Sequence, residues 1–245
     1  ANPHAIARLI GYLPEERGLY PSMKAVDAIA FMGALRGIPL KQGRERGREL
    51  LEGHGLGHAA DKQIRQLSKG MAQTVQLLGT LVHEPRLVVF DEPFSGLDAI
   101  NQGKLERLIR GLAEDGTTVI FSTHVIAHAE RLCEGVAIIA AGKVPFAGKV
   151  DEARDRIPAQ VRLETRAREG RWLEVLPADV RREGDYFHFS LPESGIEPLL
   201  RALIEGEAGI LSLSIERAGL HDAFVHIAGE AAAREMGRDR QEDAA

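Results

Sequence analysis

Two acidic residues stand directly after an apolar run near the middle of the chain. Residues 86–90 read RLVVF, and Asp91 and Glu92 follow before the segment PFSGLD. An uninterrupted apolar run of this kind is typical of a strand buried on both faces of a parallel sheet. Ligands of open α/β sheets bind at the carboxyl ends of the strands. Asp91 would hold Mg²⁺ there directly or through water, and Glu92 would polarise an attacking water as a general base. A lone acidic pair in a surface turn is the alternative, which the flanking segments disfavour.

A second candidate site lies at the start of an expected helix. Residues 67–73 read LSKGMAQ, in which Ser68 is a good N-cap residue and Lys69 and Gly70 follow it. The free N–H groups and the dipole of a helix N-terminus attract anions, and the Ser68 hydroxyl adds a donor. Gly70 would let a phosphate approach the backbone closely. An ordinary N-cap that binds no ligand is the alternative.

The third candidate is His124, which follows the run TTVIFST at residues 117–123. An imidazole at the end of a strand can contact a phosphate or hold a water molecule. Taken alone, His124 is better explained as a half-buried histidine whose ring nitrogens are satisfied by the fold.

The rest of the pattern supplies the elements that must position these residues. Strands are expected at three apolar, β-branched runs, residues 7–12, 86–90 and 117–122. Helices are expected where apolar residues recur with a helical period, over residues 24–36, 42–54, 68–82, 101–114 and 126–133. A hairpin turning at Gly142 is expected from two short strands at 136–141 and 143–147. Strands that alternate with helices predict an α/β fold with a doubly wound sheet.

The composition of the sequence changes near residue 150, where residues 151–156 are highly charged, and Pro158 marks a boundary. We expect one domain over 1–150 and a small α+β domain over 158–229. Strands in the second are predicted at VRLET, WLEVLP, YFHFSLP and ILSLSIE, and helices at 196–204 and 220–227. The aromatic residues of this part are predicted to pack in its core: Trp172, Tyr186, Phe187 and Phe189. From Glu230 the chain is rich in Ala, Arg, Glu and Asp and is expected to fray or be disordered.

Composition narrows the classes of protein to which this chain can belong. A chain of 245 residues amounts to about 1.6 domains of ordinary size. The formal net charge of −5 gives no global attraction to nucleic acid. Cys133 is the single cysteine, so an internal disulfide is excluded and a reducing compartment is favoured. No apolar run approaches the roughly 20 residues that span a bilayer.

In this order the segments resemble the nucleotide-binding subunit of ATP-binding-cassette (ABC) transporters. LSKGMAQ is similar to the signature loop, with Ser68 at its usual position and Lys69, Gly70 and Met71 after it. RLVVFDEP resembles the Walker B strand, and SGLD, ending at Asp98, resembles the D-loop. His124 stands at the switch histidine. IGYLPEERGLYP resembles the Q-loop segment, with Glu15 where most members carry Gln, a variant similar to a bacterial drug- and sodium-export subgroup.

The resemblance implies a function and its partners. It implies a P-loop NTPase-like sheet over residues 1–150, with a helical subdomain at about 23–82, and ATP hydrolysis with Mg²⁺ that powers export. Asp91 would be the magnesium ligand, Glu92 the catalytic base with His124, and Glu15 a nucleotide contact; Ser68 to Met71 and Asp98 would serve the ATP of a second subunit. A transmembrane permease would hold the protein at the cytoplasmic face of the membrane, with no role for nucleic acid.

One departure from the family pattern is large. The phosphate loop GxxxxGK[ST] is absent, and Ala141-Gly142-Lys143-Val144, the nearest match, falls in the expected hairpin. We therefore expect a fragment that lacks the N-terminal third of the nucleotide-binding domain and is inactive alone. A soluble ABC ATPase without a transport role, and a non-catalytic binding protein that lacks the loop, remain alternatives.

Overall fold

The computed structural model describes residues 6–16 and 18–230. The chain divides into two compact units, Ala1–Val125 and Ile126–Ala245. We describe each unit by itself. The expected division into 1–150 and 158–229 stays a prediction. No helix of the described residues is long and apolar enough to cross a membrane.

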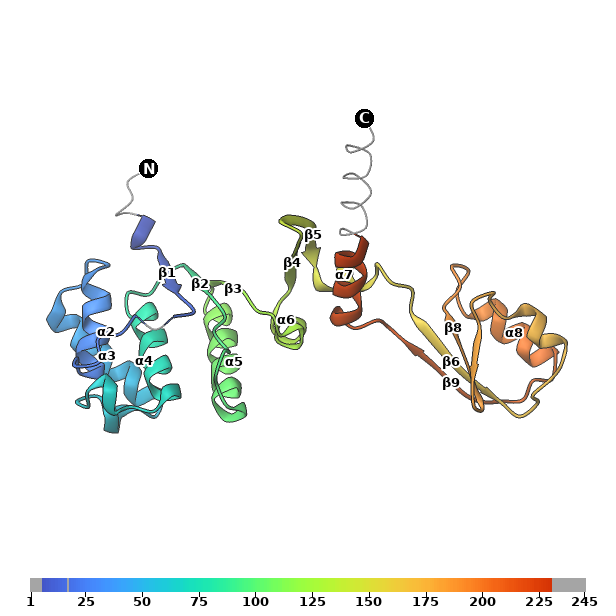
Figure 1. Cartoon of the computed structure of the whole chain (residues 1–245), viewed down its shortest axis with the longest axis horizontal. Coiled ribbons are helices and arrows are strands. Elements are labelled where there is room, and N and C mark those ends of the chain that lie inside the picture. The colour runs from blue at the N-terminus through green and yellow to red at the C-terminus, as the bar shows by residue number, and fades with distance from the viewer. Residues whose placement is uncertain (1–5, 17, 231–245) are drawn as a thin grey trace, which may run out of the picture. The chain divides into compact units, whose positions relative to one another are not determined.

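The first unit contains a parallel sheet of three strands, in the order β1-β2-β3 (Figure 1). The strands are β1 (Ile10–Leu13), β2 (Leu87–Phe90) and β3 (Thr118–Phe121). Their register is even: Leu13 pairs with Phe90, and Phe90 with Phe121. The three strands therefore end level with one another. The predicted α/β fold with a parallel sheet is confirmed.

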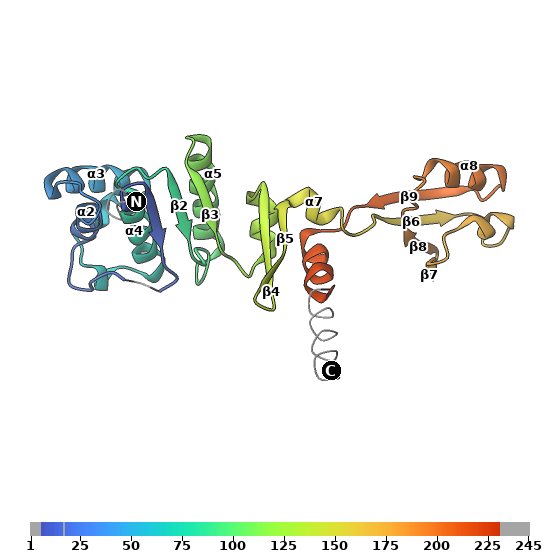
Figure 2. The ribbon, with the colours of Figure 1, turned by 90° about the horizontal axis from the view of Figure 1, so that it is seen from above.

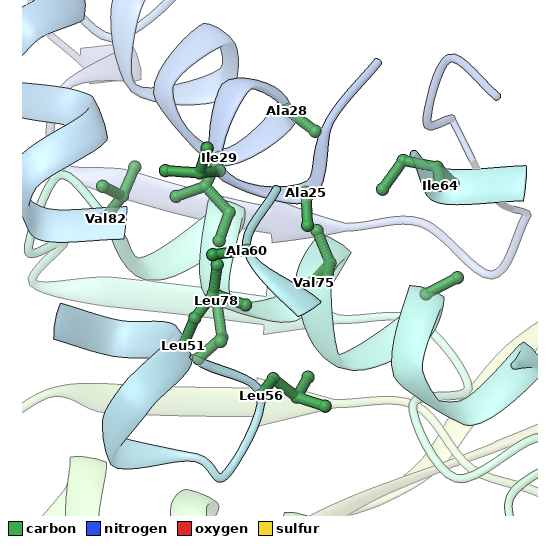
Figure 3. Close-up of a cluster of buried hydrophobic side chains, with 12 residues drawn as sticks. Ala25, Ala28, Ile29, Leu51, Leu56, Ala60, Ile64, Val75, Leu78 and Val82 are labelled. Carbon is green, nitrogen blue, oxygen red and sulfur yellow. The ribbon is translucent and has the colours of Figure 1, made fainter. Parts of the chain in front are cut away.

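Helices of the first unit form its main apolar core. The unit contains α2 (Ala25–Ala34), α3 (Leu40–Gly53), α4 (Lys69–Leu81) and α5 (Ala99–Glu114). Short 3₁₀ turns at Gly57–Ala59 and Ile64–Gln66 connect α3 to α4. The core cluster lies between α2, α3 and α4 and includes no residue of α5. Figure 3 shows this cluster, in which Ile29 of α2, Leu51 of α3 and Leu78 of α4 are fully buried. This core fixes the start of α4, where the LSKGMAQ segment lies.

Two local features hold α4 in place. Ser68 is its N-cap, and the Ser68 side chain accepts a hydrogen bond of 3.2 Å from the Met71 N–H. This confirms the expected helix start and satisfies one of the free donors of the first turn. Strand β1 approaches the other end of α4 closely at Gly11, where a Cβ would lie 2.8 Å from the Thr80 carbonyl oxygen. Glycine is therefore required at position 11 for strand and helix to pack.

The second unit begins with α6 (Ile126–Leu132) and a hairpin of β4 (Gly135–Ala140) and β5 (Lys143–Lys149). Ala141 and Gly142 form its turn with φ of 49° and 70°, as expected for a tight hairpin. Two further helical segments pack with these elements: α7 (Val150–Arg154) and a segment over 220–230. Buried residues from all of these elements make one cluster, among them Ile138, Phe146, Ala153 and Leu220.

The second sheet is antiparallel, in the order β7-β8-β6-β9, and α8 (Glu197–Glu205) covers one of its faces (Figure 2). The strands are β6 (Gln160–Thr165), β7 (Arg181–Glu183), β8 (Tyr186–Ser190) and β9 (Ile210–Glu216). The covered face carries a core built around Trp172, with Phe187 and Phe189 beside it, as predicted. Tyr186 instead lies half-buried, and the Arg162 guanidinium stacks on its ring at 3.6 Å.

Two expectations about the elements were wrong, and two elements, strand β7 and helix α7, were not predicted. Strand β1 begins at Ile10 rather than Ala7, because residues 6 and 7 are helical. The segment WLEVLP forms a 3₁₀ helix at Arg171–Val175, because the neighbouring residues Trp172 and Leu173 both pack in the core, whereas neighbours in a strand would face opposite sides. Strand β7 was not predicted because its three residues, RRE, are all charged. The expected disordered tail after Glu230 lies outside the described residues.

Candidate functional site

The predicted site residues gather where the parallel strands end. The Asp91 N–H donates to the Leu13 carbonyl at 2.8 Å, and the Ser122 N–H donates to the Phe90 carbonyl at 2.9 Å. The parallel pairing thus continues one residue past each strand. Because parallel strands end at a common edge, residues far apart in sequence meet there.

Ser122 links the two acidic residues. Its hydroxyl donates a hydrogen bond of 2.5 Å to Asp91 Oδ1. The same oxygen accepts a bond of 3.0 Å from the Glu92 N–H. One side chain therefore orients the Asp91 carboxylate and fixes the backbone at Glu92.

Glu92 has an unusual backbone conformation. Its φ is 44°, a left-handed value that is uncommon for residues other than glycine. The turn that follows is closed by the Ser95 N–H, which donates to the Glu92 carbonyl at 3.0 Å. Phe94, in the same turn, is buried and packs edge-on against Phe121 of β3, with ring centroids 5.9 Å apart. These contacts hold Glu92 in a strained conformation of the kind that is enriched at functional sites.

Glu92 and His124 form a pair. His124 Nδ1 lies 2.9 Å from Glu92 Oε2. The Glu92 side chain is 18% exposed and that of His124 is 75% exposed. The carboxylate therefore sits at the base of the site, and the imidazole is accessible from solvent. The structure brings together His124 and both acidic residues, as the sequence suggested.

A cavity of about 340 Å³ lies beside this network. Four acidic residues line it, Glu15, Glu16, Asp91 and Glu92, together with one cationic residue, Lys69. Two glutamines of α4 also line it, Gln73 and Gln76. The surplus of carboxylates makes the cavity suited to a cation that brings its own anionic ligands.

Gln73 contacts the acidic segment directly. Its Nε2 donates to the Pro93 carbonyl at 2.8 Å, whereas its Oε1 is buried without a partner among the described residues. Gln76 donates to the Glu16 carbonyl at 3.3 Å and so connects α4 to the segment after β1. A buried acceptor with no donor at the edge of a cavity is available to a ligand or water.

The signature-like and D-loop-like segments lie side by side in this chain. The Lys69 ammonium lies over Gly96, where a Cβ would come within 2.6 Å of Nζ. A Cβ on Gly70 would be 3.1 Å from Asn101 Nδ2, and Asn101 donates to Asp98 through both its N–H and its side chain at 2.9 Å. Asp98 therefore caps α5 and supports the loop that faces Gly70.

Ser68 and Met71 face a different space. Both line a larger cavity of about 680 Å³ to which α4 and α5 contribute, and leucine is the most frequent of its lining residues. They are not brought to the acidic cavity, which Lys69 reaches. The predicted site residues of this loop are thus divided between two cavities.

The donor set at Asp91 fits Mg²⁺ that arrives with phosphates. Mg²⁺ favours oxygen ligands and is commonly held by one or two carboxylates together with substrate phosphates. Asp91 supplies such a carboxylate, and Ser122 orients it. Among residues 6–16 and 18–230, no group of three His, Cys, Asp or Glu side chains is arranged to hold a metal alone.

Sequence reasoning missed Ser122, Gln73 and Gln76. Ser122 had a signal: it follows the third strand as Asp91 follows the second, and an even parallel register places the two side by side. The two glutamines had only their position in the first turns of α4. Their contacts depend on how α4 packs against the sheet, which the sequence pattern does not give.

The fold and the site together define a class. A parallel sheet carries two acidic residues and a histidine at its carboxyl edge, beside an acidic cavity and the start of a helix. This is the arrangement of an α/β domain that binds its ligand at the carboxyl edge of a parallel sheet. Comparison with known proteins identifies the family within this class.

A family model described as "ABC transporter" matches residues 2–95. The uncharacterized ABC transporter ATP-binding protein YhaQ of Bacillus subtilis (strain 168) is 30% identical over 226 residues, covering 91% of this chain and 76% of that protein. The daunorubicin/doxorubicin resistance ATP-binding protein DrrA of Streptomyces peucetius is 27% identical over 242 residues, covering 95% of this chain and 73% of DrrA. A solved structure of the ATP-binding subunit of an ABC transporter superposes with a TM-score of 0.57 and 28% identity, over 63% of this chain and 65% of that one. The chain belongs to the family of ABC transporter ATP-binding proteins.

Proposed function

We propose that this protein is the subunit of an ABC transporter that binds and hydrolyses MgATP to power export across the cytoplasmic membrane. The observation that carries the proposal is the Glu92 network. Glu92 is held in a left-handed conformation, 2.9 Å from the His124 ring and joined through Ser122 to Asp91. Phosphoryl transfer depends on positioning and charge stabilisation more than on covalent chemistry. A rigid network at the edge of a cavity provides that positioning.

Each residue of the network has a role in this proposal. Asp91 holds Mg²⁺, which when bound neutralises charge on the phosphates. Glu92 orients and polarises the attacking water, and its low exposure keeps the carboxylate in a fixed position. His124 holds the Glu92 carboxylate on its solvent side and reaches the outgoing phosphate. Glu15 contacts the nucleotide from the end of β1, on the cavity wall.

The remaining site residues serve a second subunit in the same proposal. Ser68, Lys69, Gly70 and Met71 present the start of α4 to the ATP of the partner, and Asp98 supports them through Asn101. A transmembrane permease binds the subunit at the cytoplasmic face. Support for export comes from DrrA, a relative named for daunorubicin and doxorubicin resistance. In our assignment, residues 1–150 belong to the nucleotide-binding domain and 158–229 to an accessory domain.

Replacement of Glu92 by glutamine tests the central claim. Glu92→Gln keeps the shape of the side chain and removes its capacity to act as a base. We expect ATP hydrolysis by the longest in-frame product of the gene to fall by about 10²–10⁴-fold, while binding of a fluorescent ATP analogue in the presence of Mg²⁺ is retained. Phosphate release and analogue binding are measured on the same preparation.

Glu16→Gln is the matched control. Glu16 lines the same cavity but has no role in the proposal, so its replacement should leave hydrolysis within about twofold. Hydrolysis by Glu92→Gln at the level of the unmodified protein would refute the assignment of the base. Co-sedimentation of the protein with ribosomes, in place of co-purification with a membrane subunit, would refute the transport role.

A further inference from the structure

The two outer strands of the second sheet differ sharply. At one side, β7 has three residues, Arg181, Arg182 and Glu183, and all are exposed and charged. Short length and charge are the usual means by which an edge strand avoids pairing with other chains. At the other side, β9 has seven residues, ILSLSIE, with no Lys, Arg or Pro and a single charge at its last position. One edge is thus charged along its whole length, whereas the other has its register shift only before Ser212 and carries no charge from Ser212 to Ile215.

The outer edge of β9 is open within the described chain. The strand pairs with β6 alone, and no other described strand lies beyond it. Leu211 is 54% exposed and Ile215 is 43% exposed. Leu211 has no pairing partner in β6, because the register shifts between Glu164 and Thr165. Regular pairing therefore runs from Ser212 to Glu216. A long edge that keeps apolar side chains exposed is suited to accept another strand.

The sequence of β9 matches itself when reversed. About Leu213, serines lie on either side at 212 and 214, and apolar residues follow at 211 and 215. An antiparallel pair of two such strands places each Ser212 opposite the other copy's Ser214, and each Leu211 opposite its Ile215. Directly opposed side chains are the units that stabilise a sheet. Because a two-fold axis always makes an interface of identical patches, a self-matching strand favours a second copy as partner.

We propose that β9 is a self-association surface, which pairs antiparallel with β9 of a second copy about Leu213. A single antiparallel sheet then runs through both copies. The serines line the face that carries Arg162 and Glu164, because Ser214 and Ser212 are their partners in the β6 register. Leu213 and Ile215 lie on the opposite face, which α8 covers, because their partners Leu163 and Val161 are buried in its core. This contact needs no nucleotide, and so it is independent of the proposed ATP hydrolysis.

Charge substitutions at the two serines test both the contact and its register. Ser212→Lys with Ser214→Lys opposes lysine to lysine twice across the axis, and Ser212→Glu with Ser214→Glu opposes glutamate to glutamate. We expect each doubly substituted chain to dimerise at least about tenfold more weakly than the unmodified chain. An equimolar mixture of the two opposes lysine to glutamate at every such position, and dimerisation should return. Sedimentation velocity of the 245-residue chain over a range of concentrations, without nucleotide, measures all four samples.

Recovery in the mixture separates loss of pairing from loss of folding, since a misfolded chain would not recover. Ser194→Lys, at an exposed serine outside the edge, is the control for added charge and should dimerise as the unmodified chain does. The proposal is overturned if the unmodified chain stays monomeric at every concentration. It is also overturned if the lysine and glutamate chains each dimerise as the unmodified chain does, or if their mixture fails to dimerise.

Discussion

The two larger sheets of this protein, β1-β2-β3 and β7-β8-β6-β9, place their polar residues in opposite ways. In the first unit, three parallel strands end together, and the residues that follow them meet at one edge: Asp91 and Glu92 after β2, Ser122 and His124 after β3. In the second unit, neighbouring strands run in opposite directions, so no edge collects all of their ends. Polar residues lie there across one face, while Trp172 and its neighbours fill the other.

This difference shows how strand direction determines the use of a sheet. A parallel sheet brings residues from distant parts of the sequence to one point, which suits a site that needs several groups on one small ligand. An antiparallel sheet with one covered face leaves a broad surface and two outer strands, which suits contact with another chain. The first unit carries the proposed chemistry and the second the proposed self-association for this reason.

The largest effect on stability is expected from removing the largest side chain from the core of the β7-β8-β6-β9 sheet. Trp172 is 1% exposed and packs edge-on against Phe187, with ring centroids 5.4 Å apart. Trp172→Ala should lower the free energy of unfolding of this unit by about 3–5 kcal/mol, because the cavity cannot close. Hydrogen exchange followed by mass spectrometry should then show faster exchange at residues 160–216 and unchanged exchange at residues 75–82.

Phe90→Ala is the matched change in the first unit. Phe90 of β2 is completely buried. Its replacement should give the reverse pattern, with faster hydrogen exchange in the parallel sheet and unchanged exchange in the antiparallel sheet. Faster exchange throughout both units after either substitution would contradict the view that the two sheets are separate folding units.

How much the sequence could predict also differs between the two units. In the first, long periodic segments with clear stops predicted helices α2 to α5, and apolar runs predicted all three strands, although residue 7, which is helical, was assigned to a strand. The acidic pair marked the site. In the second, three of the elements were missed or assigned wrongly: helix α7, the 3₁₀ helix at Arg171–Val175 and strand β7. All three are short, and a run of three to five residues carries too little periodicity to separate a strand from a helical turn.

The parts of the site that escaped prediction depend on contacts distant in sequence. The bond from Ser122 to Asp91 joins residues 31 positions apart and exists only because β2 and β3 are in register. The left-handed backbone of Glu92 is likewise maintained by Ser122 and by the burial of Phe94. Residue type can suggest which groups do chemistry, whereas their positioning is a property of the packed sheet.

An intermediate effect is expected from Ser122, which we infer positions Asp91 and Glu92 without reacting itself. Ser122→Ala removes both hydrogen bonds, one of them to a carboxylate, and bonds to charged groups contribute about 1.5–3 kcal/mol. In the longest in-frame product we expect kcat to fall by about tenfold or more and half-saturation by Mg²⁺ to require more metal, with KM for ATP nearly unchanged. Steady-state hydrolysis at varied Mg²⁺ and ATP separates these quantities.

Ser122→Thr and Ser95→Ala sharpen this test. Threonine keeps the hydroxyl and should restore most of the rate and the Mg²⁺ dependence. Ser95 lines the same cavity but enters the network only through its backbone, so its side chain should be dispensable. An equal fall in kcat in Ser122→Ala and Ser122→Thr would show that the size of the side chain, rather than its hydroxyl, matters at this position.

The smallest effect concerns the opposite end of the parallel sheet, where β1 begins. His83 Nε2 lies 3.2 Å from the Ile10 carbonyl, and Nδ1 is buried without a partner among the described residues. Burial lowers the pKa of His83, and nearby Arg36 lowers it further, against the opposing effect of the bond to Ile10. As pH falls through about 6.5, an unfolded histidine takes up a proton while the folded one stays neutral, so unfolding becomes easier.

His83→Gln should remove this pH dependence, because the glutamine amide can still donate to the Ile10 carbonyl and does not titrate. Chemical denaturation should give similar stabilities for the two proteins above pH 7, with the unmodified protein losing more stability as the pH falls below about 6.5. His58→Gln, at an exposed histidine of the same unit, controls for the removal of an imidazole. Parallel stability profiles for His83→Gln and the unmodified protein would show that the amino end of the sheet tolerates a charged His83. The contrast between a charged carboxyl edge and a neutral amino end would then fail.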